Sequence, residues 1–220
     1  MDFISYINND FSPIAAEASV KQVKDLFKVL PFTHFPVVEG NTFKGMIGQV
    51  DIINLLDNET PVGELSHLLQ SYHTDFDTNV LDLLSLFAQE DTDIIPVIND
   101  NHEYIGYFEL DEIIRLFYKT PFLTSSGTTL IIAKQTGSFS MSEIAQIIES
   151  NNIKILGLYI SDARSDGKTE ITLRIDTENI NEVIQSLRRY EYELLSKKAG
   201  DLLIEQLKER SDYLQKYLEI

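Results

Sequence analysis

The sequence predicts an α+β protein made of two parts, and three observations support this class. An internal repeat of about 60 residues fills the N-terminal half of the chain. Amphipathic helical patterns alternate with short apolar segments that are typical of strands. The charge also changes: residues 1–120 carry 6 basic and 20 acidic side chains, whereas residues 121–220 carry 12 and 15. Such a change in composition indicates two domains with different partners.

The composition argues against several classes of protein. The formal net charge is −17, and no Lys or Arg occurs between Lys44 and Arg115. Binding to nucleic acid or to an anionic membrane needs clustered basic residues, so we expect neither partner. Cys is absent, which excludes disulfides, thiolate metal sites and Cys nucleophiles. The N-terminus shows no secretory pattern and no apolar run approaches ~18 residues, so we expect a cytoplasmic protein.

The repeat becomes visible when the chain is shifted by 60 residues against itself. Gly45 and Gly106 are 61 residues apart, one more than the shift, and the shift of 60 applies again at Asp51 and Asp111. We place the two copies at about 1–58 and 59–119. The matching positions are Val20 with Val80, Leu26-Phe27 with Leu86-Phe87, Pro36-Val37-Val38 with Pro96-Val97-Ile98, Gly45 with Gly106, and Asp51 with Asp111.

Each copy predicts the same order of elements. A capping residue, Ser19 or Asn79, precedes an amphipathic helix. An apolar strand, a polar turn and a second strand then predict a β-hairpin. A second helix follows, from around Gln49 or Glu109. Because one such unit leaves an apolar sheet face open, we expect the two copies to close against each other. The predicted strands are 35–38 and 43–47 in the first copy, and 94–98 and 104–108 in the second.

The two copies resemble a known family. The segment His34-Phe35-Pro36-Val37-Val38, followed by a turn and Gly45-Met46-Ile47-Gly48-Gln49-Val50-Asp51, is similar to a CBS motif, the cystathionine-β-synthase domain. Ile95-Pro96-Val97-Ile98 and Gly106-Tyr107-Phe108-Glu109-Leu110-Asp111 resemble a second one. Residues 1–119 therefore resemble a tandem CBS pair, also called a Bateman module.

The second half follows a different order, β-α-β-β-α-β, which is typical of the ferredoxin-like fold. In the third strand we expect Ile171, Leu173 and Ile175 to point inward, and Thr172 and Arg174 outward. We expect a turn-rich boundary at 120–127, the domain itself at 127–197 and a C-terminal helix at 198–220. The predicted elements are strand 128–135, helix 141–151, strands 153–161 and 169–176, helix 179–189 and strand 192–195.

This domain resembles an ACT domain over residues 127–197, through Gln135-Thr136-Gly137-Ser138-Phe139 and Asn152-Ile153-Lys154-Ile155-Leu156-Gly157. A CBS pair followed by an ACT-like domain resembles the acetoin-utilisation type of CBS protein. The resemblance implies an amino-acid site at a dimer interface, with Gln135, Gly137 and Ser138 in its loop. The alternative is that Gly137 only makes the β–α turn.

No catalytic motif is present. The sequence holds no nucleophile elbow and no phosphate-binding glycine loop, and its four His residues lack zinc spacing, so we expect neither a metal site nor an enzyme. The CBS resemblance implies that an adenine nucleotide, namely AMP, ATP or an S-adenosyl compound, binds between the copies. The implied site residues are Phe35, Pro36, Gly45, Gly48, Asp51, Pro96, Gly106 and Asp111.

Asp51 and Asp111 are the implied acceptors for ribose hydroxyls, and the alternative is that they only stabilise a helix dipole by about 0.3–1 kcal/mol. Where the family carries Thr or Ser, this chain has Gly48 and Glu109. A carboxylate repels phosphate, so the first copy is the better nucleotide site.

We therefore expect a non-enzymatic regulatory module that senses a small metabolite and acts as a homodimer. One alternative is an assembly subunit that binds another protein and has degenerate ligand sites. A second alternative is a module that responds to Mg²⁺ or Ca²⁺, because hard oxygen ligands cluster in the second copy. These acids are Asp91, Asp93, Glu109, Asp111 and Glu112.

Overall fold

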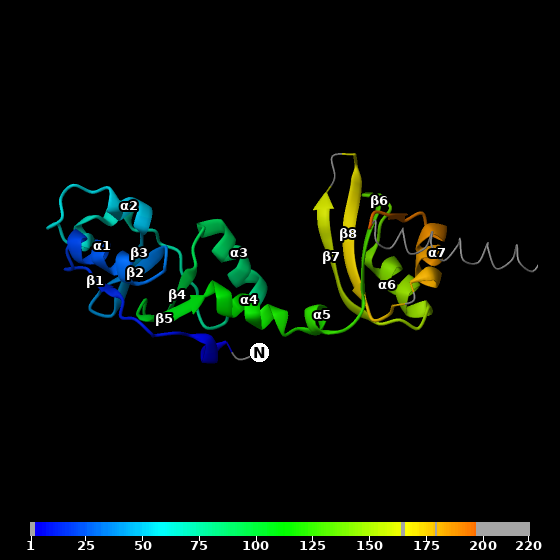
Figure 1. Cartoon of the computed structure of the whole chain (residues 1–220), viewed down its shortest axis with the longest axis horizontal. Coiled ribbons are helices and arrows are strands. Elements are labelled where there is room, and N and C mark those ends of the chain that lie inside the picture. The colour runs from blue at the N-terminus through cyan, green and yellow to red at the C-terminus, as the bar shows by residue number, and fades with distance from the viewer. Residues whose placement is uncertain (1–2, 164–165, 179, 197–220) are drawn as a thin grey trace, which may run out of the picture. The chain divides into compact units, whose positions relative to one another are not determined.

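The computed structural model describes residues 3–163, 166–178 and 180–196. The chain forms two compact units, Met1–Lys119 and Thr120–Ile220. Figure 1 shows the helices and strands of each unit. The predicted C-terminal helix at 198–220 lies outside the described residues.

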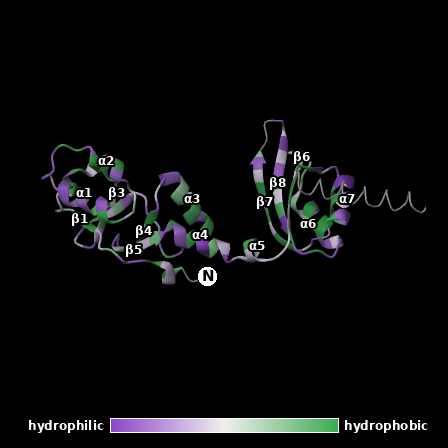
Figure 2. Cartoon of the chain, viewed as in Figure 1, coloured by the Kyte–Doolittle hydropathy of each residue, from purple (hydrophilic) through white to green (hydrophobic). Residues whose placement is uncertain are grey.

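The first helices of the two copies begin at the predicted caps. Helix α1 (Val20–Val29) follows Ser19, whose hydroxyl accepts a hydrogen bond from Gln22 N while its own N–H donates to the Gln22 side chain. This reciprocal pair satisfies two backbone donors at the helix start. Helix α3 (Val80–Glu90) follows Asn79, whose side chain accepts from the next turn. Both predicted caps are confirmed, and α3 carries more hydrophobic than hydrophilic residues (Figure 2).

Both predicted hairpins are present, and they share an irregularity. In each hairpin the register shifts by one residue, between Val37 and Val38 or between Val97 and Ile98. The shifts occupy equivalent positions because the two copies are built alike. The elements are β1 (Ile14–Ala15), β2 (His34–Glu39), β3 (Thr42–Gly48) and α2 (Gln49–Ile53) in the first copy, and β4 (Ile94–Ile98), β5 (Tyr104–Glu109) and α4 (Leu110–Tyr118) in the second, with 3-10 turns at Ile4–Tyr6, Val62–Glu64 and Ser66–Leu68.

The segment before each copy crosses from one sheet to the other. Asn8 forms an antiparallel bridge to Tyr107 of β5, and Ile14 then pairs with Val37 of β2. Gln70 correspondingly bridges to β3 before Thr74 pairs with β4. Each lead segment therefore joins both copies.

The two copies keep separate sheets, β1-β2-β3 and β4-β5, within residues 3–119. The sheets nevertheless meet at their turns, because Phe43 N donates to His102 O and Tyr104 N donates to Asn41 O, each at 2.9 Å. The expected closure of one copy against the other is thus achieved by packing and by turn-to-turn hydrogen bonds.

Each copy has its own hydrophobic core. Val20, Phe35 and Ile52 are fully buried in the first, and Leu83 and Phe108 in the second. Burying a side chain of this size stabilises the fold by about 1.5–3 kcal/mol. Phe11 and Phe32 pack against both cores, so apolar contact continues across the pair.

The second unit has the predicted order of elements, and its antiparallel sheet runs β7-β8-β6-β9. The turn-rich stretch predicted at 120–127 instead contains a short helix, α5 (Pro121–Thr124), which begins at proline because the fixed φ of proline suits the first helical position. The other elements are β6 (Thr128–Gln135), α6 (Met141–Ser150), β7 (Ile155–Ala163), β8 (Lys168–Ile175), α7 (Asn181–Arg189) and β9 (Glu193–Leu194).

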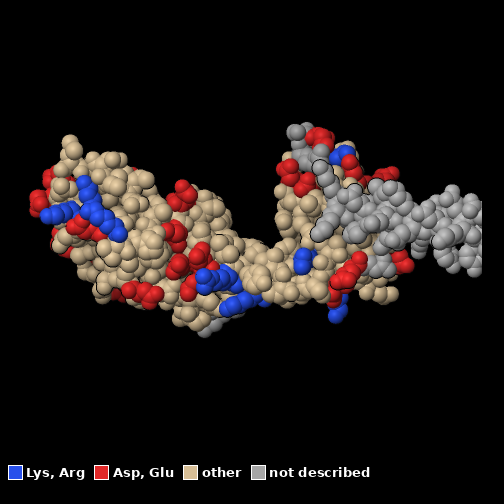
Figure 3. All heavy atoms as spheres, viewed as in Figure 1, with Lys and Arg blue, Asp and Glu red and all other residues tan. Residues whose placement is uncertain are grey.

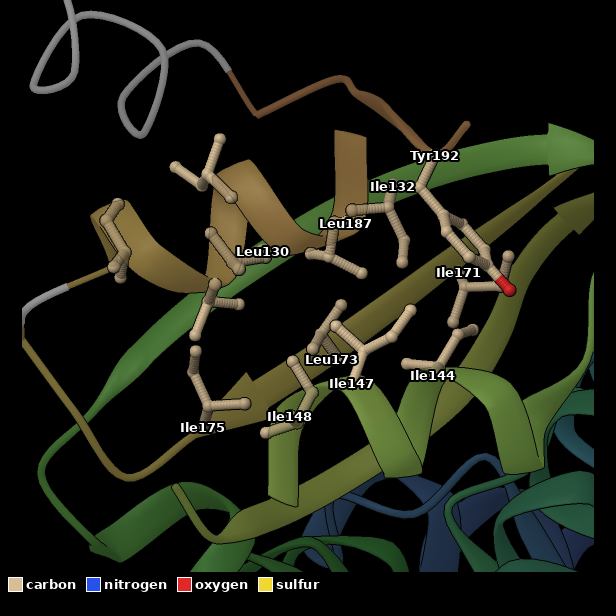
Figure 4. Close-up of a cluster of buried hydrophobic side chains, with 13 residues drawn as sticks. Leu130, Ile132, Ile144, Ile147, Ile148, Ile171, Leu173, Ile175, Leu187 and Tyr192 are labelled. Carbon is tan, nitrogen blue, oxygen red and sulfur yellow. The ribbon is translucent and has the colours of Figure 1, made fainter. Parts of the chain in front are cut away.

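One face of this sheet packs against α6 and α7. Leu130 and Ile132 of β6 and Leu173 of β8 point toward Ile147 and Leu187 (Figure 4). The predicted inward direction of Ile171, Leu173 and Ile175 is confirmed, since all three are fully buried. Thr172 is also buried, at 7% exposure, although it was expected to face outward into solvent. The reason is its place in a central strand, between Ile131 and Tyr159.

Candidate functional site

Gly48 stands where β3 ends and α2 begins. It is the residue before the helix, and Asp51 lies in the first helical turn. In the sheet, Gly48 pairs with His34, the first residue of β2. A Cβ atom at Gly48 would lie 2.9 Å from Asp51 Oδ2 and 3.1 Å from His34 Nε2. We call Gly48, Asp51 and His34 the Gly48 cluster.

A chain of hydrogen bonds links this cluster to the second copy. His34 Nδ1 lies 2.9 Å from Thr33 Oγ1, and Thr33 Oγ1 donates to Asp93 Oδ1 at 2.9 Å. The backbone N–H of Thr33 also donates to both Asp93 oxygens at 3.1 Å. Asp93 therefore holds Thr33 through its main chain and its side chain, and this connects His34 to the second copy.

His34 is buried, at 7% exposure. Burial lowers the pKa of the His34 imidazole, because charging a group away from water is costly, and the carboxylates of Asp93, Asp51, Asp91 and Glu90 offset part of this effect. His34 is consequently neutral near pH 7.

Tyr72 closes the cluster from the segment that crosses between the copies. Its ring lies 6.2 Å from the His34 ring, edge to face. Tyr72 is 8% exposed, and its buried hydroxyl has no hydrogen-bond partner of good geometry. Burial raises the pKa of Tyr72, and the Thr92 hydroxyl offsets a small part of that increase. A buried hydroxyl of this kind is costly unless a further group satisfies it.

The equivalent position in the second copy is chemically different. Glu109 precedes α4 as Gly48 precedes α2, but it pairs with Ile94 where Gly48 pairs with His34. Three residues after the cap stands Glu112, so Glu112 and not Asp111 is the structural equivalent of Asp51. Glu112 Oε2 accepts a hydrogen bond from Asn8 Nδ2 at 2.8 Å. Burial raises the pKa of Glu109, and neighbouring carboxylates add to this increase.

Aromatic side chains fill the space between the copies beside β5. Phe11 stacks on Tyr107 with ring centres 4.6 Å apart, and Phe32 lies 5.3 Å from Phe11 and 5.8 Å from Tyr107. Burial raises the pKa of Tyr107 to about 12. We call Phe11, Phe32 and Tyr107 the aromatic joint. The second copy thus presents carboxylates and this packed joint rather than an open nucleoside site.

The remaining predicted CBS site residues are buried or are covered by other segments of the chain. Phe35 is fully buried against Phe27, and Pro36 and Pro96 are buried within their strands. A Cβ atom at Gly45 would lie 2.8 Å from Leu69 Cβ, and one at Gly106 would lie 2.5 Å from Ile7 Cγ2. Both glycines are therefore needed for the close approach of the crossing segments.

Of the eight predicted CBS residues, the structure brings Gly48 and Asp51 together and leaves Asp111 exposed on α4. His34, Thr33, Tyr72, Asp93 and Glu112 were not among them. One signal was available in the sequence, because Thr33 and Asp93 are 60 residues apart and occupy equivalent positions of the repeat.

The predicted amino-acid loop is a tight turn open to solvent. Gln135 O accepts hydrogen bonds from Ser138 N at 2.8 Å and Phe139 N at 3.1 Å, and α6 begins directly after Ser140. Gln135, Gly137 and Ser138 are all exposed, and a Cβ atom at Gly137 would meet nothing within 4 Å.

The cation-responsive alternative lacks a ligand set. In residues 3–163, 166–178 and 180–196, no three His, Asp or Glu side chains are grouped so that they could hold a metal ion. The five acids named for this alternative therefore do not converge. On the face shown in Figure 3, acidic side chains are spread over the surface, while basic ones gather in a few groups.

A cavity of about 500 Å³ lies elsewhere in the first copy, near the Lys44–Glu39 ion pair (2.6 Å). None of the predicted site residues lines it. Its walls are Ala16, Glu17, Glu39, Lys44, Pro61, Gly63, Glu64, Ser66 and Leu69.

Comparison with known proteins identifies the two copies. Residues 4–58 and 70–119 match the family model of the CBS domain, so the first unit carries tandem CBS domains. No curated protein matches the chain. None of the helices within the described ranges is both long and apolar enough to span a bilayer.

Several solved structures are similar to this chain. One is a CBS domain pair/ACT domain protein from Thermotoga maritima, with 16% identity and a TM-score of 0.48 over 54% of this chain and 98% of the other. CBSX2 in complex with AMP shows 18% identity and a TM-score of 0.45 over 52% and 94%. The cytosolic domain of the Mg²⁺ channel MgtE in complex with ATP shows 19% and 0.43 over 50% and 46%.

Proposed function

We propose that this chain is a non-enzymatic regulatory module whose CBS pair senses a small metabolite at the Gly48 cluster. The observation that carries this proposal is that Asp51 Oδ2 and His34 Nε2 both lie close to Gly48, at 2.9 Å and 3.1 Å from the position that its Cβ would occupy. The CBS match supports it, because pairs of CBS domains serve as ligand-responsive regulatory units. Catalysis has no comparable support, since the chemistry that converges here is hydrogen bonding.

The charge around the cluster favours an uncharged or cationic nucleoside. Asp51 is suited to accept hydrogen bonds from ribose hydroxyls. Asp93, Asp91 and Glu90 lie close enough to affect His34, and no Lys or Arg occurs from residue 45 to residue 114. Phosphates placed here would meet carboxylates of like charge. We therefore rank adenosine and the sulfonium cation of S-adenosylmethionine above AMP, and AMP above ATP.

The response would pass through Thr33 and Asp93. A ligand that contacts His34 in the first copy changes the hydrogen bond that ends on Asp93 in the second. Binding would then shift the relative packing of the copies toward the arrangement that it contacts better.

Isothermal titration of the full chain with adenosine, S-adenosylmethionine, AMP and ATP tests this function. We expect binding of the first two and progressively weaker binding of AMP and ATP. Asp51→Asn should weaken binding at least about tenfold, because one charged acceptor is lost, whereas Asp111→Asn is the matched control and should not. Flat titrations with all four compounds would contradict the proposal.

The second candidate function is an assembly subunit, and the packed aromatic joint beside Glu109 favours it. Exposed apolar side chains on and after α2 are the surface proposed for a second copy or another protein: Val50 at 74%, Ile53 at 56% and Leu56 at 97%. Light scattering coupled to size exclusion should report a homodimer that Leu56→Glu dissociates, with Leu81→Glu on α3 as the control. A wild-type chain that elutes as a monomer would count against self-association.

The second unit supports a further proposal, that residues 127–197 are an ACT-like, ferredoxin-like domain that senses an amino acid. The sheet order β7-β8-β6-β9 with helices between the first and second and the third and fourth strands is the arrangement that supports it. Because the Gly137 loop is open, a ligand there would need cover from a partner chain. A thermal-shift screen with the twenty amino acids tests this, and Gly137→Val should abolish any shift observed.

A further inference from the structure

The cavity of about 500 Å³ beside the first copy is bounded by segments that backbone hydrogen bonds fix in place. Ala16 N donates to Val38 O at 2.7 Å, and Gly63 N donates to Ala16 O at 2.8 Å. Gln70 and Met46 exchange two further backbone hydrogen bonds, at 2.7 and 2.9 Å. The walls therefore exist before any ligand binds, and the volume falls within the range of about 300–1,000 Å³ that is usual for small-molecule sites.

The walls combine an apolar surface with carboxylates. Ala16 and Leu69 line the cavity, are half-buried and pack against the hydrophobic core of the first copy. Glu17, Glu39 and Glu64 line the same cavity and are exposed. Such walls suit a ligand with an apolar body and positively charged ends, because its methylene groups leave water while its charges stay near the carboxylates.

Two of the three carboxylates are available to a ligand. Lys44 Nζ lies 2.6 Å from Glu39 Oε2, so this ion pair adds no net charge to the cavity. Within the part of the chain that the structure describes, neither Glu17 nor Glu64 has an ion pair or a side-chain hydrogen bond. The cavity therefore carries two uncompensated negative charges, which attract a ligand with two positive charges.

A metal ion does not match this arrangement. A divalent cation needs several oxygen ligands within about 2.0–2.6 Å of one point. As noted for the second copy, the described ranges contain no three His, Asp or Glu side chains grouped in that way. The three carboxylates of the cavity thus do not converge on one point. Two ammonium groups separated by a flexible methylene chain match carboxylates that stand apart.

We propose that this cavity is a binding site for an aliphatic diamine, with its methylene chain on Ala16 and Leu69 and its ammonium groups near Glu17 and Glu64. None of the residues of the Gly48 cluster lines the cavity, so the site is separate and does not rest on the proposed function. Glu17 follows the first segment that crosses between the copies, and Glu64 precedes the second. A bound diamine would therefore link the end of one crossing segment to the start of the other.

Isothermal titration of the full chain with putrescine and with Mg²⁺ tests the class of ligand. Both cations carry two positive charges, so the comparison separates the effect of the apolar walls from general attraction to a chain of net charge −17. We expect putrescine to bind at least about tenfold more tightly than Mg²⁺, because only putrescine has methylene groups to bury. Absence of putrescine binding, or Mg²⁺ binding of equal strength, would overturn the proposal.

Paired substitutions test the location of the site. Glu17→Gln combined with Glu64→Gln should weaken putrescine binding by about fivefold or more, because two exposed ion pairs are lost. Glu149→Gln combined with Glu178→Gln is the matched control, since it removes the same charge from exposed positions of the second unit. Equal weakening in both double variants would overturn the site. Asp51→Asn should leave putrescine binding unchanged, and a loss there would overturn its separation from the Gly48 cluster.

Discussion

Thr33 and Asp93 occupy equivalent positions of the two CBS domains, and they hydrogen-bond to each other. They are 60 residues apart, and Asp93 accepts three hydrogen bonds from the backbone and hydroxyl of Thr33. Equivalent residues of two similar copies meet only near an axis that relates the copies. This contact therefore marks the centre of the pair, and His34 ties it to the Gly48 cluster.

Replacing Asp93 should weaken the pair. Asp93→Ala removes a charged acceptor of three hydrogen bonds, and we expect a loss of about 1–3 kcal/mol in the free energy of unfolding. Urea denaturation followed by circular dichroism measures this. Asp77→Ala, which removes an exposed carboxylate outside this contact, is the control, and an equal loss in both variants would contradict a specific role for Asp93.

Removing the carboxylate of Asp51 should make His34 harder to protonate. Asp51 raises the pKa of His34 against the larger effect of burial. In Asp51→Asn the pKa of His34 should fall further below its ordinary value of about 6.5. A pH titration of the His34 ring signals by NMR checks this, with Asp111→Asn as the variant that should leave the pKa unchanged.

Neutralising Glu109 should stabilise the protein near pH 7. The pKa of Glu109 is raised in the folded state, so the folded chain binds the proton of this carboxyl more tightly than the unfolded chain does. The ionised form is therefore disfavoured in the fold, and stability from this residue falls as the pH rises above its unfolded pKa. Glu109→Gln should raise Tm at pH 7 and change it little at pH 4, where the carboxyl is protonated in both states.

The increase in Tm that Glu109→Gln causes at pH 7 should exceed the increase caused by Glu59→Gln, which removes an exposed charge of the same sign. This comparison separates the local burial of Glu109 from the general repulsion in a chain of net charge −17. Equal gains from the two variants would show that burial of Glu109 is not the cause.

The aromatic joint should contribute much of the contact between the CBS copies. Phe11 packs against Phe32, Phe35 and Tyr107. Phe11→Ala should cost up to about 3 kcal/mol in the free energy of unfolding, because Phe11 is only partly buried and a fully buried phenylalanine usually costs about 3–5 kcal/mol. Phe76→Ala, at a side chain that is 38% exposed, is the control and should cost much less. Chemical denaturation of both variants measures the difference.

In the second unit, the two glycines of the ACT-like resemblance should respond in opposite ways. A Cβ atom at Gly157 would collide with the Phe122 ring of α5, whereas one at Gly137 would meet nothing within 4 Å. Gly157→Ala should therefore lower Tm by several degrees, corresponding to about 1–3 kcal/mol of overpacking. Gly137→Ala should leave Tm nearly unchanged, and a similar loss at both positions would contradict this account.

The sequence by itself determined the local features of this protein. The caps at Ser19 and Asn79, the two hairpins and the order of elements in the second unit depend on residues near each other in the chain, so periodicity and spacing reveal them. The repeat of 60 residues likewise predicted tandem CBS domains, which the family match confirms.

Only the tertiary structure decided which residues form the candidate site. The turn of the second hairpin is one residue longer, which places Glu112 and not Asp111 at the position of Asp51, and the crossing segments cover Gly45 and Gly106. Meanwhile Thr33, His34 and Tyr72 meet Asp51 and Asp93 across long sequence separations. Such contacts depend on how two similar copies pack about their common axis, and no spacing along one copy records that arrangement.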